Sequence, residues 1–325
     1  MFNKCDIETK RILKRLLEEG TLDKNPRPHY EEKYTGEDLK EGQWVKDGSI
    51  LCTPAHTLSY NHEMVTYDLS KGEFPLCTLR PTAIKSAIAE IIWIYFKQSN
   101  DLVVFDELLG KNTWDTDHKI NNWWEEWAIK DKDGNYILNE AGHPTIGSCY
   151  GETVRHYKLM DNCIDKLKND PDNRRNIINL WQETDFLEAH GLKPCAFLTQ
   201  WNVRHTSDGD YLDMCLTQRS SDFCTAGVIN QAQYAVLLLI VAAYTGYKPG
   251  KFTWFVNNIQ CYDRHIEQAK EMLSRDTIPC MPFVEILESK PENIFDIMPA
   301  DIKIVNYPIK EIKDKNPQLT FDIGI

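Results

Sequence analysis

The sequence predicts a mixed α+β fold. Segments with alternating apolar residues, typical of strands, fill residues 176–219 and return at 252–262. Segments with apolar residues at helical spacing lie before, between and after them. Because strands and helices follow no regular βαβ rhythm, α+β packing is favoured over a doubly wound parallel sheet. There is also no GxGxxG motif and no phosphate-binding loop of the GxxxxGK type.

Each element has a local reason in the sequence. Helix 6–19 ends at Gly20, helix 82–97 begins after Pro81, and helix 160–169 ends before Pro171. Further apolar patterns predict helices at 230–244 and 263–274, and strands at 176–181, 197–204, 211–219 and 252–262. Residues 21–50 are polar and rich in turn residues, and residues 116–145 are irregular enough to indicate an exposed insertion.

Composition is that of a soluble globular protein. The 325 residues are 42% hydrophobic and 26% charged, without repeats or linkers, so we expect one domain over 1–325. The net charge of −12 disfavours a protein that coats nucleic acid or an anionic membrane. The longest apolar run, residues 234–244, is shorter than the roughly 20 residues of a membrane span. We therefore expect a cytoplasmic protein.

The ten cysteines are scattered without a CxxC pair. A chain of this length needs no disulfide framework, so we expect reduced thiols that are mostly small buried side chains. No His and Cys spacing resembles a zinc site, and no metal is expected.

A predicted hairpin gathers chemically useful side chains at one end. If Asp208 and Gly209 are its two central residues, paired positions sum to 417, and Cys195 lies opposite Asp222. Gln218 and Arg219 then lie a few residues away. A nearby cation favours the reactive thiolate, which makes Cys195 a candidate nucleophile. The alternative is a core thiol beside a surface arginine, and both interpretations remain open.

Other polar residues have two interpretations each. Arg174 and Arg175 lead into a strand, where neighbouring side chains point to opposite faces, and they suit phosphate or simply solvent. Glu90 lies on an apolar helix flank. It is either a buried acid that exchanges protons or a residue at the edge of the flank whose carboxylate reaches water. Asn230 could read the edge of a planar heterocycle or cap its helix. The cluster Trp123-Trp124-x-x-Trp127 favours core packing over ligand stacking.

Together these motifs resemble the thymidylate synthase family over most of the chain. The matching segments are CTPAHTL (52–58), GEFPLCTLRP (72–81), AEIIWIY (89–95), WWEEWA (123–128), TIGSCYG (145–151), NDPDNRRNI (169–177), LKPCAF (192–197), LTQRSSD (216–222), residues 230–234, CYDRH (261–265) and the C-terminal TFDIGI. The resemblance implies a large mixed or antiparallel sheet covered by helices on one face and a sheet-to-sheet homodimer. It also implies synthesis of dTMP from dUMP with 5,10-methylenetetrahydrofolate.

The resemblance also implies a role for each matching residue. Cys195 resembles the nucleophile that adds to C6 of uracil, and Glu90 and Tyr150 resemble a proton-relay pair. Asp222 would contact the ring or the folate pterin. The residues that would hold the nucleotide are Arg174 and Arg175 from the second subunit, Gln218, Arg219, Ser220, Asn230, Tyr262 and the N-terminal candidate Arg27. Trp124, Trp127 and the C-terminal Ile325 would lie near the folate.

The sequence departs from the family at several positions. Ala196 replaces the usual His after the nucleophile, Gln260 replaces the His before the ribose-binding Tyr262, and CTAGVIN precedes the site in place of LGxPFN. Cys77-Thr78-Leu79-Arg80 replaces TTKR, which removes a lysine that favours a polyglutamate tail. These changes leave the nucleophile, the arginines and Asn230 in place.

Three alternative functions remain. A pyrimidine-nucleotide hydroxymethylase would share the covalent adduct but end with water, which depends on how well the closed site excludes water. A cysteine hydrolase would need a histidine base, for which His190 and His205 are the nearest in sequence. An RNA-binding regulator without catalysis is disfavoured by the net charge.

Overall fold

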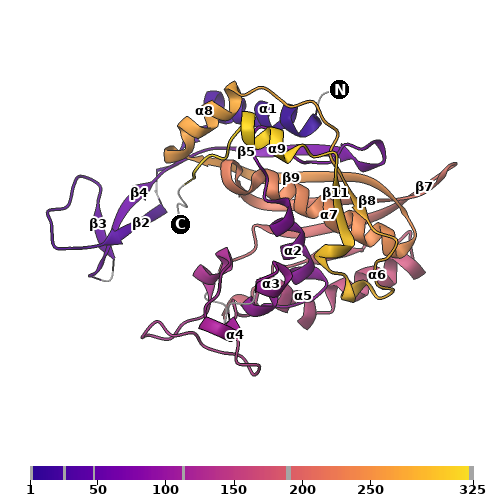
Figure 1. Cartoon of the computed structure of the whole chain (residues 1–325), viewed down its shortest axis with the longest axis horizontal. Helices are drawn as coiled ribbons and strands as arrows, with labels where there is room; N and C mark the ends of the chain where they lie inside the picture. Colours follow the sequence, from indigo (N-terminus) through magenta and orange to yellow (C-terminus); the bar gives the residue numbers. More distant parts are fainter. Residues whose placement is uncertain (1–2, 25–26, 47, 112–113, 188–191, 322–325) are drawn as a thin grey trace.

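A six-stranded sheet forms the centre of the protein (Figure 1). The computed structural model describes residues 3–24, 27–46, 48–111, 114–187 and 192–321. In spatial order the strands are β1 (Thr21–Leu22), β5 (Thr57–Asp68), β9 (Lys248–Tyr262), β8 (Gly209–Asp222), β7 (Ala196–Thr206) and β6 (Ile177–Asn179). All neighbours are antiparallel except β8 and β9, which are parallel. The predicted mixed α+β class is confirmed.

The remaining elements are helices and two smaller sheets. The helices are α1 (Lys4–Glu19), α2 (Ile84–Tyr95), α3 (Leu102–Leu108), α4 (Trp114–Asp117), α5 (Gly151–His156), α6 (Leu159–Asn169), α7 (Val228–Thr245), α8 (Ile266–Ser274) and α9 (Ile309–Lys315), with the short helices η2 (Trp123–Trp127) and η4 (Phe223–Gly227). Two smaller sheets contain β2 (Arg27–Lys33), β4 (Ile50–Ala55) and β3 (Trp44–Lys46), and β10 (Phe283–Ile286) with β11 (Ile302–Val305). The β2–β4–β3 sheet projects from the rest of the molecule (Figure 1).

The helices cover one face of the large sheet. On β8 the even-numbered residues from Leu212 to Gln218 are buried, whereas the odd-numbered residues between them are only half-buried. Tyr67 on β5 contacts both main covering helices: its hydroxyl donates to Gln231 of α7 at 2.8 Å, and Lys4 of α1 lies over its ring. On the opposite face of β5, Met64 is 62% exposed. The period of two along the strands therefore separates a core face from an uncovered face.

Helix α7 forms the centre of the core. With the preceding π-helical turn η4 it gives one helix, residues 223–245, whose length and mean hydropathy of 1.7 would suit a membrane span. Its most apolar stretch is 72% buried inside the protein, and the buried core helix of a soluble protein can have the same length and composition. The apolar run counted from the sequence, residues 234–244, leaves out residues 223–233, which form the first part of this helix. Seven of the ten cysteines are also buried, as expected for small apolar side chains.

The β7–β8 hairpin forms, but its register differs from the prediction. Thr206 pairs with Gly209, so Ser207 and Asp208 are the central residues and paired positions sum to 415. A register shift between Ala196 and Leu198 moves the pairing by one more residue. The prediction that Cys195 lies opposite Asp222 is therefore wrong. Cys195 lies opposite Arg219, whose backbone N–H donates to the Cys195 carbonyl oxygen at 2.9 Å.

Other boundaries were missed for recognisable reasons. Strands β2 and β3 fall in residues 21–50, which the sequence marked only as polar and turn-rich, and β4 and β5 fall in residues 50–68, for which no element was predicted. Arg174 and Arg175 lie in a turn before the short strand β6, so the strand-face argument does not apply to them. In the segment 116–145, residues 130–141 are mostly exposed, as expected of an insertion, whereas Trp124 is buried in the core.

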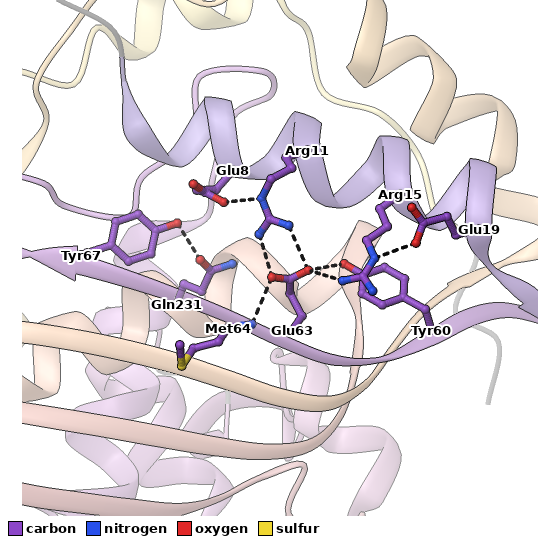
Figure 2. Close-up of polar contacts among 9 residues, drawn as sticks. All are labelled: Glu8, Arg11, Arg15, Glu19, Tyr60, Glu63, Met64, Tyr67 and Gln231. Atoms are coloured by element: carbon purple, nitrogen blue, oxygen red, sulfur yellow. Dashed lines mark hydrogen bonds and ion pairs between the residues drawn. The ribbon is translucent and has the colours of Figure 1, made fainter.

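A buried carboxylate connects α1 to the sheet. Glu63 of β5 is 4% exposed and accepts hydrogen bonds from Arg11 at 2.7 and 3.1 Å (Figure 2). Arg15 and the hydroxyl of Tyr60 also donate to it, at 3.4 and 2.7 Å. Burial alone would raise the pKa of Glu63, but these donors outweigh it and the pKa is lowered. The ion pair therefore stabilises the docked position of α1 only while Glu63 is ionised.

Replacing Glu63→Gln should lower the free energy of unfolding by about 2 kcal/mol at neutral pH, since it leaves two guanidiniums beside an uncharged buried group. We place the value below that of a fully buried pair because Arg11 is partly exposed. A lowered folded-state pKa means that the contribution is lost as pH falls through it, so the difference should shrink in acid. Urea unfolding measures this. Glu19→Gln, at an exposed partner of Arg15, is the control and should change stability by less than about 0.5 kcal/mol. A Glu63→Gln effect as small as the control's would contradict the prediction.

Candidate active site

Cys195 and Arg219 meet where β7 and β8 pair. The Arg219 guanidinium binds the backbone of the two residues that precede Cys195. Its Nε donates to the Pro194 carbonyl oxygen at 3.1 Å, and its Nη2 donates to the Lys193 carbonyl oxygen at 3.0 Å. Nη1 donates to Ser220 Oγ at 3.2 Å, and Ser220 Oγ lies 3.9 Å from Cys195 Sγ. Cys195 is only half-buried, so its thiol is accessible to a ligand.

Arg219 is suited to hold an anion. These three contacts use three of the five N–H groups of the guanidinium and leave one each on Nη1 and Nη2. Among the described residues no carboxylate forms an ion pair with it, so its charge is not neutralised inside the protein. Its guanidinium carbon lies 5.7 Å from the centre of the Trp181 ring. A fixed, unneutralised fork of this kind matches phosphate oxygens.

A chain of side-chain hydrogen bonds crosses the site from β9 to α2. Trp254 Nε1 donates to Gln218 Oε1, and Gln218 Nε2 donates to Asn230 Oδ1 at 3.2 Å. Asn230 Nδ2 donates to Gln233 Oε1 at 3.4 Å, and Gln233 Nε2 donates to Glu90 Oε1 at 3.0 Å. The predicted heterocycle-reading amide and the predicted acid are thus connected through one glutamine.

Glu90 is a carboxylate without a cation beside it. Its second oxygen accepts from Trp123 Nε1 at 3.0 Å, and no ion pair to Glu90 exists in the described part of the chain. The side chain retains some solvent exposure, yet burial of the carboxyl group raises its pKa, and the bonds from Gln233 and Trp123 lower it only in part. A carboxyl group with a raised pKa can exchange protons closer to neutral pH.

Aromatic rings form a wall beside Glu90. Trp124 is 1% exposed, with its ring centre 4.9 Å from that of Tyr150 and 6.0 Å from that of Trp127. Trp123, at 46% exposure, lies at the open side of the wall. Tyr150 adopts a φ of +49°, a strained conformation for a residue with a side chain. Burial raises the pKa of its phenol, and the neighbouring Cys195 raises it further, so this hydroxyl holds its proton.

Asp222 and Tyr262 lie at the same end of the sheet, close to the last residues of β8 and β9. Asp222 Oδ2 accepts from Thr225 Oγ1 at 2.6 Å and lies 3.9 Å from His265 Nδ1. Its Oδ1 is buried and has no hydrogen-bond partner among the described residues. An unpaired buried acceptor is costly, which makes it a natural contact for a ligand with N–H donors. Tyr262 is buried with its ring 5.5 Å from that of His265.

Several predicted residues are not brought into this cluster. Arg174 and Arg175 are exposed in the turn after α6, and no ion pair involves either within the described ranges. Ile325 and His190 lie outside the described residues, and so does the side chain of Arg27. His205 is at the hairpin tip, bonded to Asp210 and Asp172 and ten residues along β7 from Cys195, so it cannot serve as a base for that thiol. Where the chain is described, no three His, Cys, Asp or Glu side chains cluster as metal ligands would.

Two contacts of the cluster escaped the sequence reasoning. Gln233 connects Asn230 to Glu90, and Trp123 Nε1 donates to the Glu90 carboxylate. The available signal for Gln233 was a polar side chain in the apolar run of α7. Gln231 gives the same signal but bonds to Tyr67 and to the Gly227 carbonyl oxygen, away from Glu90. Sequence alone does not distinguish the two glutamines.

Replacing Glu90→Gln should change how stability depends on pH. Since the pKa of Glu90 is raised in the folded state, the folded wild type binds this proton more tightly than the unfolded chain. Wild-type stability therefore declines as pH rises from the ordinary value of 4.5 through the raised pKa, and the variant lacks this decline. The difference in melting temperature, variant minus wild type, should become more positive between about pH 4 and pH 7.

Thermal unfolding over this pH range measures the effect, with Glu63→Gln as the matched control. The pKa of Glu63 is lowered, so its difference should change only below about pH 4.5 and should stay nearly constant from there to pH 7. A Glu90→Gln difference that stays constant, or that follows the Glu63→Gln trend, would contradict the assignment of a raised pKa.

Comparison with known proteins identifies the family. A sequence profile described as thymidylate synthase matches residues 32–316. A thymidylate synthase from Lactococcus lactis subsp. lactis is 40% identical over 318 residues, covering 97% of each chain, and one from Streptococcus gordonii is 39% identical over 324 residues, covering 99% of each. The solved structure of thermostable thymidylate synthase A from Bacillus subtilis matches with a TM-score of 0.74 and 26% identity, covering 99% of both chains. The chain belongs to the thymidylate synthase family.

Proposed function

We propose that this protein converts dUMP to dTMP by reductive methylation, with 5,10-methylenetetrahydrofolate as co-substrate and dihydrofolate as second product. Family membership supports this reaction, and no described feature favours a hydroxymethylase. The observation that carries the proposal is the position of the half-buried Cys195 thiol. Its sulfur lies 3.9 Å from Ser220 Oγ, which accepts from Arg219, and the same cysteine contributes to the raised pKa of Tyr150.

The protein would bind the nucleotide at both its phosphate and its uracil ring. Its phosphate would accept from the two unused N–H groups of Arg219 and from Ser220, with Arg174 and Arg175 supplied by a second subunit. Asn230, held by Gln218, would read the uracil edge, and Tyr262 would hold the ribose hydroxyl. Arg27 is a further proposed phosphate ligand. With these contacts the C6 atom of uracil would face the Cys195 sulfur.

The first bond formed would join Cys195 Sγ to C6, with the ring taking up the electron pair as an enolate at C4–O4. The Glu90 carboxyl, with its raised pKa, would exchange the proton that this charge requires, and Tyr150 would hold the companion hydroxyl. The one-carbon unit of the folate would join at C5, the C5 proton would leave to a base, and the bond between that carbon and the folate nitrogen would break. Hydride from the folate would then complete the methyl group, the C–S bond would break, and dTMP and dihydrofolate would be released.

The side chains present fit a flat, hydrogen-bonding folate. The wall made of Trp124, Trp127 and Tyr150 offers ring faces and edges for stacking. The unpartnered Oδ1 of Asp222 offers an acceptor for N–H groups of a pterin. We place Ile325 at the same site as the closing C-terminal residue, as the family resemblance implies, and no metal takes part in this proposal.

We further propose a sheet-to-sheet homodimer with shared active sites in the cytoplasm. Two observations support the dimer: the uncovered face of the six-stranded sheet, with the exposed Met64, and the exposed Arg174 and Arg175, which form no ion pair with any described residue. The free thiols are those of a reducing compartment. Sedimentation at micromolar concentration should give twice the chain mass. A monomer that turns over dUMP unaided would contradict the shared site.

Incubation of the purified protein with dUMP and 5,10-methylenetetrahydrofolate tests the reaction. The absorbance increase of dihydrofolate should appear together with dTMP in equal amounts. Formation of 5-hydroxymethyl-dUMP with unoxidised tetrahydrofolate would overturn the proposal in favour of the hydroxymethylase. Absence of any product would refute both.

Replacing Cys195→Ser supplies the matching test of the nucleophile. Turnover should fall by about four orders of magnitude or more, because an alcohol is a far weaker nucleophile than a thiolate. The dissociation constant of dUMP should stay within about threefold, since the groups that grip it remain. Cys280→Ser, at another half-buried thiol whose neighbours are Asp6 and Asn3, is the control and should keep full activity. Retained turnover in Cys195→Ser would refute the assigned nucleophile.

A further inference from the structure

The amide of Asn230 is fixed from one side by a donor that cannot be reversed. The indole N–H of Trp254 can only donate, so it must face the oxygen of the Gln218 amide. The Gln218 nitrogen then points the other way and donates to Asn230 Oδ1 at 3.2 Å. Because Gln218 is completely buried, water cannot replace either bond.

The other side is fixed by a group that accepts. The Glu90 carboxylate accepts from Gln233 Nε2 at 3.0 Å, which turns Gln233 Oε1 towards Asn230. Asn230 Nδ2 donates to this oxygen at 3.4 Å. If the Asn230 amide were reversed, two N–H groups would face each other at Gln218 and two oxygens would face each other at Gln233. Both ends of the chain therefore favour the same orientation of Asn230.

This orientation leaves a defined pair of groups for a ligand. Of the hydrogen-bonding capacity of the Asn230 side chain, one N–H of Nδ2 and one lone pair of Oδ1 remain unused. A uracil edge offers the complementary pair, the O4 acceptor and the N3–H donor. A cytosine edge offers the reverse, an N4–H donor and an N3 acceptor, and would need the reversed amide.

We propose that Gln233 is a specificity-determining positioning residue, which acts together with Gln218 to lock Asn230 in the orientation that binds uracil and rejects cytosine. The proposal rests on the proposed function, because it takes a pyrimidine nucleotide as the ligand. Gln233 does not touch the ligand itself; its oxygen holds Asn230 and its nitrogen holds Glu90. At 2% exposure it is shielded from water that could substitute for it.

The Gln233→Met variant tests whether Gln233 holds Asn230 in this orientation. Methionine has nearly the same length but neither accepts from Asn230 nor donates to Glu90 as an amide does. Calorimetric titration of the full-length protein with dUMP and with dCMP gives the ratio of the two dissociation constants. We expect this preference for dUMP to fall about tenfold, as for the loss of a buried hydrogen bond.

The neighbouring glutamine provides a matched control. Gln231→Met removes an equally buried amide from the same helix, but its partners are Tyr67 and the Gly227 carbonyl oxygen. This variant should lose stability yet keep the wild-type preference for dUMP. An equal loss of preference in both variants would show that general loosening of α7 is responsible, and would overturn the proposal.

The Gln233→Glu variant distinguishes the hydrogen bond to Asn230 from the packing of the side chain at position 233. Glutamate keeps an oxygen for Asn230, and the two facing carboxyl groups of residues 90 and 233 would share one proton. The preference for dUMP should therefore be retained here although it is lost in Gln233→Met. Its loss in both, or its retention in Gln233→Met, would overturn the lock. A wild-type protein that binds neither nucleotide would instead refute the proposed function.

Discussion

The pairing of β7 with β8 at Cys195 and Arg219 is the contact on which the site depends. One backbone hydrogen bond of 2.9 Å places the thiol across from the arginine. The same strand then presents Gln218 to the interior, next to Trp254, and Ser220 beside the sulfur. Because β8 also pairs with β9, the ends of both strands bring Asp222 and Tyr262 to the same region. Strand geometry thus brings together the proposed nucleophile, the proposed anion site and the amide proposed to read the ring.

A second constraint is the cost of the polar groups that this arrangement buries. Glu90 has its pKa raised by burial and forms no ion pair with any residue that the structure describes, whereas Glu63 under α1 is surrounded by Arg11 and Arg15 and has its pKa lowered. The two carboxylates show the difference between a group suited to exchange a proton, as proposed for Glu90, and one that stabilises the fold through ion pairs. Around Glu90 the donors are an indole and an amide, which orient the carboxyl group without fixing its charge. We infer that burial of Glu90 lowers the stability of the folded protein and also allows this carboxyl group to exchange its proton.

The sequence was informative where structure is local. Helices α1, α2 and α6 follow from apolar spacing and from Gly or Pro at one end, α7 follows from its apolar pattern, and the hairpin follows from alternation around a turn. The register was missed because the turn centres on Ser207 and Asp208 and because an irregularity near Ala196 adds one residue. Candidate residues were recognised by motif, but the connection of Asn230 to Glu90 through Gln233 was not, since it depends on how α7 packs against α2. Long-range packing decides between two glutamines that look alike in sequence.

The central claim is a covalent bond between Cys195 and C6 of the uracil ring. Incubation with 5-fluoro-dUMP and 5,10-methylenetetrahydrofolate tests it most directly, because fluorine at C5 cannot leave as a proton does and the reaction stops after the bonds to sulfur and carbon have formed. Mass spectrometry of the digested protein should find nucleotide and folate together on the peptide that contains Cys195. A peptide of unmodified mass, or the adduct on another cysteine, would contradict the account.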